Sequence, residues 1–218
     1  MIFIGDVHGD FQGLGAVLKK VSAERPDEPI IQIGDLGVGF GKSVPHYSVP
    51  WKFFRGNHDN PDEARALPNH LGDFGYFGEE PPLKGLFFVA GGLSVDKNFR
   101  LERYRAGFWK EPFWWPDEEL SEESLEMAYE TYKANQPNIV ATHEPPAAIA
   151  DLLTRMALAS FSNDKRFPSR TGKWLERMLN VHQPQYWVFG HWHIRWRKKI
   201  NSTVFYGLPE LGHCRVVV

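Results

Sequence analysis

The residues best able to do chemistry in this 218-residue chain lie near its two ends. Asp6 and His8 form an Asp-x-His pair, and His191 and His193 form a His-x-His pair. Carboxylate oxygens and imidazole nitrogens are common ligands of transition-metal ions. Each pair lies beside a short apolar run that could hold it in place. The two pairs together therefore predict a metal site, and with it a metalloenzyme.

Short apolar runs that end in a glycine or a polar residue recur along the chain and predict strands. We expect strands at residues 1–4, 29–33, 51–55, 85–90, 137–141, 186–189, 195–200, 203–206 and 214–218. Apolar residues at helical spacing predict helices at residues 10–23, 117–135, 147–160 and 170–181. The first strand-helix-strand unit favours a parallel, right-handed crossover. The predicted class is mixed α/β.

Polar residues stand just after the carboxyl ends of several predicted strands. They are Asp6, Asp35, Asn57, His143 and His191. In open α/β sheets the loops at that edge converge on one crevice, where ligands bind. Five segments that are far apart in the sequence can therefore meet at one site.

The order of the motifs resembles that of the calcineurin-like metallophosphoesterases. The motifs are Gly-Asp-x-His at 5–8, Gly-Asp at 34–35, Gly-Asn-His-Asp at 56–59, a lone His143 after a strand, and Gly-His-x-His at 190–193. Each motif alone is common, but five in this order along nearly the whole chain are specific. The resemblance implies a four-layer α/β/β/α sandwich, in which two mixed sheets are flanked by helices, in a single domain over residues 1–218.

The resemblance also implies two divalent metal ions and their ligands. The first ion would be bound by Asp6, His8, Asp35 and His193. The second would be bound by Asp35, Asn57, His143 and His191, so that Asp35 bridges the two ions. The chemistry supports this independently, because a carboxylate can share its oxygens between cations about 3.5 to 4 Å apart. Mixed nitrogen and oxygen ligands suit Mn, Fe, Zn or Ni better than Ca or Mg, and we favour Mn.

Such a site would hydrolyse a phosphate ester with a metal-bound hydroxide, because coordination lowers the pKa of water to about 7. His58 adjoins the ligand Asn57 but lies outside the ligand set, and the family gives its matching histidine the role of general acid. Asp59 is a second catalytic candidate, which either orients a loop or a neighbouring base or caps a turn. Arg55 either reaches the phosphate or ends its strand in solvent.

The chain departs from the protein serine/threonine phosphatases just after Asp35. Those enzymes carry Asp and Arg three and four residues after this position, whereas this chain has Val38 and Gly39. The phosphate-clamping Arg and the Asp that supports the general acid are thus missing locally. Val38 also stands where the purple acid phosphatases place a metal-binding Tyr. His58 must therefore find another partner, or act without one.

Residues 91–116 are expected to form a loop insertion near the site, and they resemble a segment of small bacterial and phage members of the family. Basic residues alternate there with aromatic ones. Arginines can pair with phosphate oxygens and aromatic faces can stack on bases, which favours a nucleotide or nucleic-acid substrate. Asp96 and Arg100 are the candidate substrate-binding residues. Alternatively, the aromatic side chains bury one another as a small core.

These features favour a phosphodiesterase that acts on cyclic or linear nucleotides. The missing clamp for a dianionic monoester points the same way. Two alternatives stay open. The first is a phosphomonoesterase, including a serine/threonine protein phosphatase. The second is a catalytically inactive family scaffold, although this chain keeps all the site histidines that such scaffolds typically lose.

Composition limits the partners and the compartment. With 25 Lys and Arg against 27 Asp and Glu, the net charge is −2, so any contact with nucleic acid must come from a local patch. A single cysteine, Cys214, excludes an internal disulfide and favours a reducing compartment. No apolar run approaches the roughly 20 residues of a membrane helix, and the N-terminal run is too short for a signal peptide. We expect a cytoplasmic protein with no membrane partner.

Overall fold

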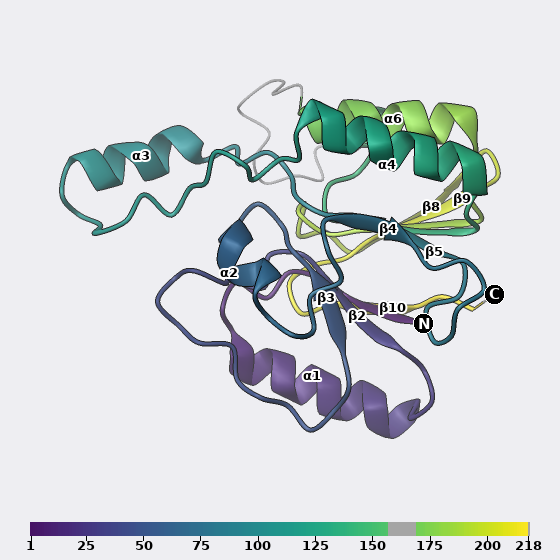
Figure 1. Cartoon of the computed structure of the whole chain (residues 1–218), viewed down its shortest axis with the longest axis horizontal. Coiled ribbons are helices and arrows are strands. Elements are labelled where there is room, and N and C mark those ends of the chain that lie inside the picture. The colour runs from purple at the N-terminus through teal and green to yellow at the C-terminus, as the bar shows by residue number, and fades with distance from the viewer. Residues whose placement is uncertain (157–168, 218) are drawn as a thin grey trace.

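The computed structural model describes residues 1–156 and 169–217, and two mixed sheets pack face to face at its centre (Figure 1). The four-stranded sheet has the order β10-β1-β2-β3, with β1 (Ile2–Ile4), β2 (Ile30–Ile33), β3 (Lys52–Phe54) and β10 (His213–Arg215). The six-stranded sheet has the order β4-β5-β6-β7-β9-β8, with β4 (Phe74–Tyr76), β5 (Leu86–Val89), β6 (Ile139–Thr142), β7 (Tyr186–Phe189), β8 (Trp196–Ile200) and β9 (Thr203–Gly207).

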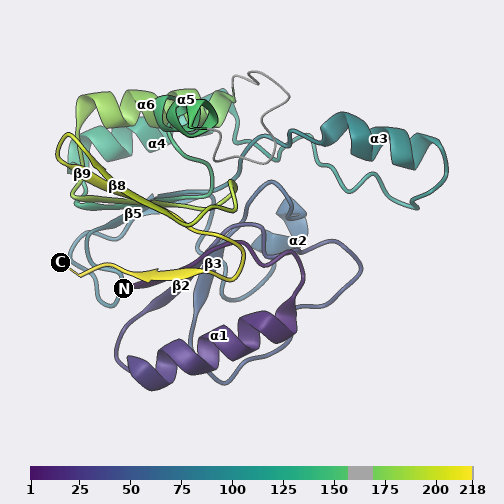
Figure 2. The same ribbon diagram turned by 180° about the vertical axis from the view of Figure 1, so that it is seen from behind.

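Helices cover the outer faces of both sheets, and this makes four layers. Helix α1 (Phe11–Glu24) lies against the four-stranded sheet, while α4 (Glu122–Asn135), α5 (Ala147–Arg155) and α6 (Arg170–Val181) lie against the six-stranded sheet (Figures 1 and 2). This is the α/β/β/α sandwich that the sequence predicts. None of the helices in the described ranges has the length and the apolar character of a transmembrane span.

Several strands are buried on both faces, and this explains why their sequences are short, continuous apolar runs. In β1, Ile2 and Ile4 pack with α1, whereas Phe3 between them belongs to the cluster that fills the space between the two sheets. A third cluster lies between the six-stranded sheet and its helices, with the fully buried Trp187 and Tyr132 among its members. The alternation within β1 follows from the two-residue period of a strand.

The direction of the strands sets the place of the site. Strands β1, β2 and β3 run parallel, and so do β5, β6, β7 and β9. The antiparallel strands β10, β4 and β8 lie at the outer edges. The carboxyl ends of the parallel strands, where the polar motif residues stand, therefore share one edge in each sheet.

Several element boundaries differ from the sequence prediction. Helix α4 begins at residue 122 rather than at 117, because Ser121 caps it by accepting a hydrogen bond from the backbone N–H of Ser124. Strand β10 ends at Arg215. The helix predicted at 147–160 is confirmed as far as Arg155, and residues 157–160 lie outside the described residues, as does residue 218.

Three elements were not predicted from the sequence: α2 (Pro61–Arg65), β4 and α3 (Lys97–Arg105). Residues 91–116, expected as a loop, contain α3, which projects sideways from the body of the molecule (Figures 1 and 2). Its one buried residue is Arg100, so α3 has no apolar stripe that would have predicted a helix.

Candidate metal centre

The predicted ligands stand within four residues of the ends of five parallel strands, and four of the seven have strained backbones. His8, Asp35, His191 and His193 have φ of 49°, 55°, 64° and 49°, in the left-handed region. Such residues cost about 1 to 3 kcal/mol each and persist only where the surroundings hold them. The surroundings do so here: the backbone N–H of His8 donates to Asp35 O at 2.9 Å. The backbone N–H of His191 donates to Asp6 Oδ1 at 3.0 Å.

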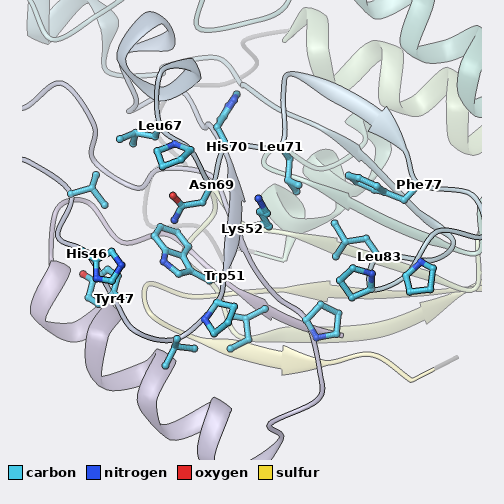
Figure 3. A pocket seen from close by; sticks show the side chains of 18 of the residues that line it. His46, Tyr47, Trp51, Lys52, Leu67, Asn69, His70, Leu71, Phe77 and Leu83 are labelled. Atoms are coloured by element: carbon cyan, nitrogen blue, oxygen red, sulfur yellow. The ribbon is translucent and has the colours of Figure 1, made fainter.

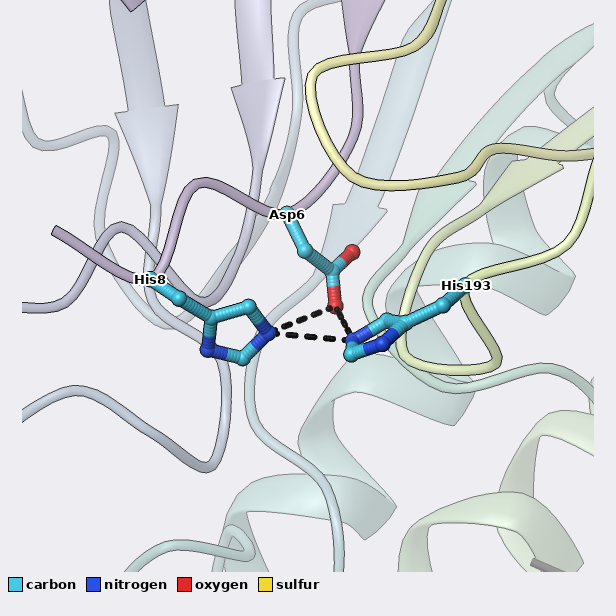
Figure 4. Close-up of side chains that lie close together, drawn as sticks. All are labelled: Asp6, His8 and His193. Carbon is cyan, nitrogen blue, oxygen red and sulfur yellow. Dashed lines mark hydrogen bonds and ion pairs between the residues drawn. The ribbon is translucent and has the colours of Figure 1, made fainter. Parts of the chain in front are cut away.

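One group of side chains joins the two ends of the chain (Figure 4). His193 Nε2 lies 3.0 Å from Asp6 Oδ2 and 3.0 Å from His8 Nε2, and His8 Nε2 lies 3.7 Å from Asp6 Oδ2. His193 Nδ1 lies 3.1 Å from Glu210 Oε1. A carboxylate only accepts, so this contact keeps a hydrogen on Nδ1 and leaves Nε2 as the ring nitrogen that faces Asp6.

A second group contains Asp35, His143 and His191. His143 Nδ1 lies 3.0 Å from the carbonyl oxygen of Ile33, which can only accept, so Nδ1 carries the hydrogen. His143 Nε2 then faces two further acceptors, Asn57 Oδ1 at 2.9 Å and Asp35 Oδ1 at 3.2 Å. The amide nitrogen of Asn57 donates to Ser94 Oγ at 3.0 Å, which directs Oδ1 at His143.

Asp35 and His143 shift the pKa of each other at this centre. Burial works to raise the pKa of the Asp35 carboxyl, but positive charge on His143, His58 and His8 outweighs it and holds that pKa well below 3.8. Burial works to lower the pKa of His143, but the carboxylates of Asp35 and Asp6 outweigh it and raise that pKa to about 10. The converging nitrogen and oxygen atoms fit a divalent ion of the Mn to Zn series.

Asp35 lies between the two groups. Its Oδ1 faces His143 Nε2 at 3.2 Å, whereas its Oδ2 faces His8 Nε2 at 3.8 Å. Its Oδ1 also accepts a hydrogen bond from the backbone N–H of His58 at 2.7 Å. The two oxygens of one buried carboxylate are thus directed at ligands of different groups, as a bridging ligand requires.

Two motif glycines leave room for these carboxylates. A Cβ at Gly56 would lie 2.1 Å from Asp35 Oδ1, and a Cβ at Gly190 would lie 2.3 Å from Asp6 Oδ1. Both distances are far below a van der Waals contact. The glycines that end these strands therefore also make space for the candidate ligands.

The family model described as calcineurin-like phosphoesterase matches residues 1–195. The chain belongs to this family. No match is found among curated proteins. Among solved structures, the chain is similar to GAP50, described as the anchor in the inner membrane complex of Plasmodium. The two share 9% sequence identity with a TM-score of 0.48, over 96% of this chain and 71% of that one.

Membership of the calcineurin-like phosphoesterase family confirms the resemblance that the motif order indicated. The family is metal-dependent and acts on phosphate esters, and the His and Asp groups described above are its candidate ligand groups in this chain. A third group of potential ligands consists of His8, Asp35 and His58.

In this calcineurin-like phosphoesterase, His58 lies beside the metal groups, and its partners come from α3. The His58 and His8 ring centroids are 5.0 Å apart. Arg100 Nη2 lies 2.8 Å from His58 Nδ1 and 2.6 Å from Nε2, and Asp96 Oδ1 lies 3.7 Å from Nε2. Sequence reasoning singled out Asp96 and Arg100 for the substrate, but not as partners of His58.

Asp59 holds two loops together. Its fully buried carboxylate accepts four hydrogen bonds, which the backbone N–H groups of Leu36, Gly37, Val38 and Gly56 donate at 2.7 to 3.1 Å. Burial and the charge of Asp35 raise its pKa. These contacts support the loop-orienting interpretation of Asp59 rather than a direct part in catalysis. They fix the loop after β2, which carries Asp35, to the loop after β3, which carries His58.

Arg55 does not end its strand in solvent, and that expectation is wrong. The side chain is fully buried, its Nε donates to Asp73 Oδ1 at 2.8 Å, and its Nη1 donates to the carbonyl of Glu118 at 2.9 Å. The guanidinium is thus engaged by an internal carboxylate and a carbonyl. These contacts favour a structural role over the predicted contact with a phosphate.

A pocket of about 840 Å³ lies at the β3 edge of the four-stranded sheet (Figure 3). Prolines and large apolar side chains, including Trp51 and Phe77, form most of its wall. None of the predicted site residues lines it.

Sequence reasoning missed two residues that orient candidate ligands, Ser94 and Glu210. No local motif marks either of them.

Proposed function

We propose that this protein is a dinuclear metal-dependent phosphoesterase with His58 as the general acid. The proposed ligand sets are those implied by the family motifs, with Asp6, His8, Asp35 and His193 for one ion and Asp35, Asn57, His143 and His191 for the other. The observation that carries the proposal is the position of Asp35, whose two oxygens face different groups at 3.2 and 3.8 Å.

The chemistry divides between the ions and the side chains. When bound, two cations, for which we favour manganese, neutralise charge on the phosphate and lower the pKa of the attacking water. Glu210 and the carbonyl of Ile33 keep the Nε2 atoms of His193 and His143 available as ligands. His58 donates a proton to the leaving oxygen, and Asp59 keeps its loop in register with that of Asp35.

Metal removal and reconstitution test the proposal. Chelated protein should lack turnover of 4-nitrophenyl phosphate esters and regain it with Mn²⁺, with about two ions bound per chain by elemental analysis. Asp35→Asn should lose both ions and turnover, whereas His46→Gln, which changes an exposed histidine outside the site, should lose neither. A protein that shows no metal-dependent turnover would be the inactive scaffold, and the proposal would be wrong.

The segment 91–116 supports a phosphodiester substrate, such as a cyclic or linear nucleotide. It carries five basic and three acidic residues in a chain whose net charge is −2. Its aromatic rings pack on one another in part, as in the contact between Trp109 and Phe113. Phe99 and Phe108 nevertheless stay 52% and 69% exposed, with Arg103 over both rings. Exposed rings beside arginines can stack on bases and bind phosphates.

One observation favours the alternative, a phosphomonoesterase or protein phosphatase. The loop after Asp35 has no arginine that could clamp a phosphate. Arg100, whose Nη2 is directed at His58, supplies a positive group at the site instead. A guanidinium there could bind the second charge of a monoester. Bis(4-nitrophenyl) phosphate and 4-nitrophenyl phosphate, compared by kcat/KM with Mn²⁺, separate the two. A much higher value for the monoester, with phosphopeptide hydrolysis abolished by His58→Ala, would reverse the diester preference.

A further inference from the structure

Arg100 reaches the candidate metal centre from outside its motifs. Its side chain is 6% exposed, although α3 projects from the body of the molecule. Its Nε donates to Asp96 Oδ2 at 2.6 Å, and its Nη1 donates to the carbonyl of Phe113 at 2.5 Å. Two of the three guanidinium nitrogens are thereby fixed within segment 91–116. The third, Nη2, is left to face His58.

Asp96 has an oxygen directed at the same ring. Its Oδ2 is engaged by Arg100, whereas its Oδ1 lies 3.7 Å from His58 Nε2. That Oδ1 is shielded from solvent and has no hydrogen bond in the described part of the chain. Burial works to raise the pKa of Asp96, but the neighbouring His58 and Arg100 side chains outweigh it and lower the pKa to about 2. The carboxylate is therefore anionic at neutral pH.

The chain thus supplies, from α3, the two residue types that are absent from the loop after β2. At that loop the backbone N–H of Val38 binds Asp59, and Gly39 has no side chain to offer. Asp96 is the N-cap residue of α3, Arg100 lies one helical turn further on, and the two reach His58 together. A carboxylate can accept a hydrogen bond from an imidazole N–H. A guanidinium whose third nitrogen is not fixed within its own segment can donate a hydrogen bond to a phosphate oxygen.

We infer that Asp96 is a positioning residue that orients His58 for proton donation, and that Arg100 is a catalytic residue that binds a phosphate oxygen through Nη2. The inference rests on the proposed function. An anionic phosphate oxygen is a stronger acceptor than a neutral imidazole, so a bound substrate draws Nη2 away from His58. The ring N–H then pairs with Asp96 Oδ1. When Arg100 binds the substrate, His58 is thereby released to be oriented by Asp96.

The step balances as an ordinary hydrolysis. The water oxygen forms a bond to phosphorus, the bond between phosphorus and the leaving oxygen breaks, and the proton on Nδ1 of His58 moves to the leaving oxygen while Nε2–H stays paired with Asp96. The proton released by the water passes to solvent, which later returns one to His58. Esters with poor leaving groups need this proton, whereas esters of acidic phenols leave without it.

A leaving-group series tests the role of Asp96. In Asp96→Asn, turnover of phenyl phosphate esters should fall about 100-fold, because protonation by a positioned acid contributes about 10² to 10⁴. Turnover of the matching 2,4-dinitrophenyl esters should change less than about threefold. Glu102→Gln, which alters an exposed acid on the same helix, is the control and should leave both unchanged. An equal loss on both esters would indicate a merely structural role and overturn the inference.

Binding of inorganic phosphate to the manganese-loaded protein tests Arg100. By titration calorimetry, Arg100→Gln should weaken phosphate binding about tenfold or more, as expected for a lost charge-assisted hydrogen bond. Arg100→Lys, which keeps the charge, should recover part of the loss. The kinetic loss in both variants should be the same for phenyl and dinitrophenyl esters. Unchanged phosphate affinity in Arg100→Gln would contradict the assignment.

A third measurement does not depend on activity. In ¹⁵N-histidine spectra of the metal-free protein, the His58 ring signals, assigned with His58→Gln, should shift in Asp96→Asn and Arg100→Gln but not in Glu102→Gln. Unchanged signals in both variants would overturn the inference even where the enzyme is active. Absence of all turnover in the wild-type protein would instead contradict the proposed function, and the spectra would still decide whether α3 sets the His58 ring.

Discussion

At the scale of single residues, the candidate centre is held by backbone conformations and contacts that few side chains tolerate. His8, Asp35, His191 and His193 all have positive φ, and their side chains converge from separate turns. The family resemblance implied these candidate ligands, and their positions after buried strands predicted that the segments carrying them could meet. It could not predict the atoms that orient them, because Glu210 and the carbonyl of Ile33 belong to no recognisable motif.

Gly56→Ala should damage the centre without changing a ligand. The added Cβ would lie 2.1 Å from Asp35 Oδ1 and 2.4 Å from the backbone nitrogen of Asp35, so the proposed bridging carboxylate must move. We expect Mn²⁺ affinity, measured by titration calorimetry, to fall by about 10- to 100-fold, the range seen when residues that orient ligands are lost.

Gly172→Ala is the matched control for this substitution. It adds a methyl group in α6 that would lie no closer than 3.4 Å to its neighbours, so it should leave the affinity unchanged. Equal Mn²⁺ affinity in Gly56→Ala and the wild-type protein would show that the position of Asp35 is not critical for metal binding.

At the scale of elements, the parts that position the site differ in how well the sequence predicts them. Strands β1, β2, β6 and β7 are continuous apolar runs, and they were predicted within two residues at each end. Strand β4, Phe-Gly-Tyr, is short and only half-buried. Helix α3 buries one arginine and no apolar stripe. The partners of His58 therefore could not be found from periodicity, because they lie on a helix that tertiary contacts alone reveal.

The ion pair of Arg55 and Asp73 links the end of β3, in one sheet, to the start of β4, in the other. Asp73→Asn should destabilise the protein by about 3 kcal/mol, because it leaves a buried guanidinium without its counter-charge. Asp62→Asn, which removes a 94% exposed partner of Arg65, is the control and should cost less than about 1 kcal/mol. Urea unfolding at neutral pH measures both.

The same pair predicts a dependence on pH. Burial works to raise the pKa of Asp73, but the charges of Arg55 and Arg65 and their hydrogen bonds outweigh it and lower the pKa below 3.8. The stability that this carboxylate contributes is therefore complete above pH 3.8 and is lost as the pH falls through the lowered value. The free-energy difference between wild type and Asp73→Asn should shrink over that acid range, and a constant difference would contradict the assigned pairing.

At the scale of the whole molecule, the proposed ligands come from both sheets and both ends of the chain. Asp6, Asp35 and Asn57 follow strands of the four-stranded sheet, whereas His143 and His191 follow strands of the six-stranded sheet. Bound ions would therefore tie the two sheets together at one edge, while the inter-sheet core around Phe3 and Phe88 ties them along their faces. We propose that the two sheets form one folding unit.

Metal binding should accordingly stabilise the whole chain in a single step. At Mn²⁺ a hundredfold above its dissociation constant, binding adds about 2.7 kcal/mol per site, which for a chain of this size raises Tm by roughly 5 to 10 °C for each ion bound. Differential scanning calorimetry of chelated and Mn²⁺-loaded protein should show one transition in each, shifted upward by the metal, and no shift in Asp35→Asn. Two separate transitions, only one of which responds to Mn²⁺, would show instead that the sheets unfold independently and that the ions do not bridge them.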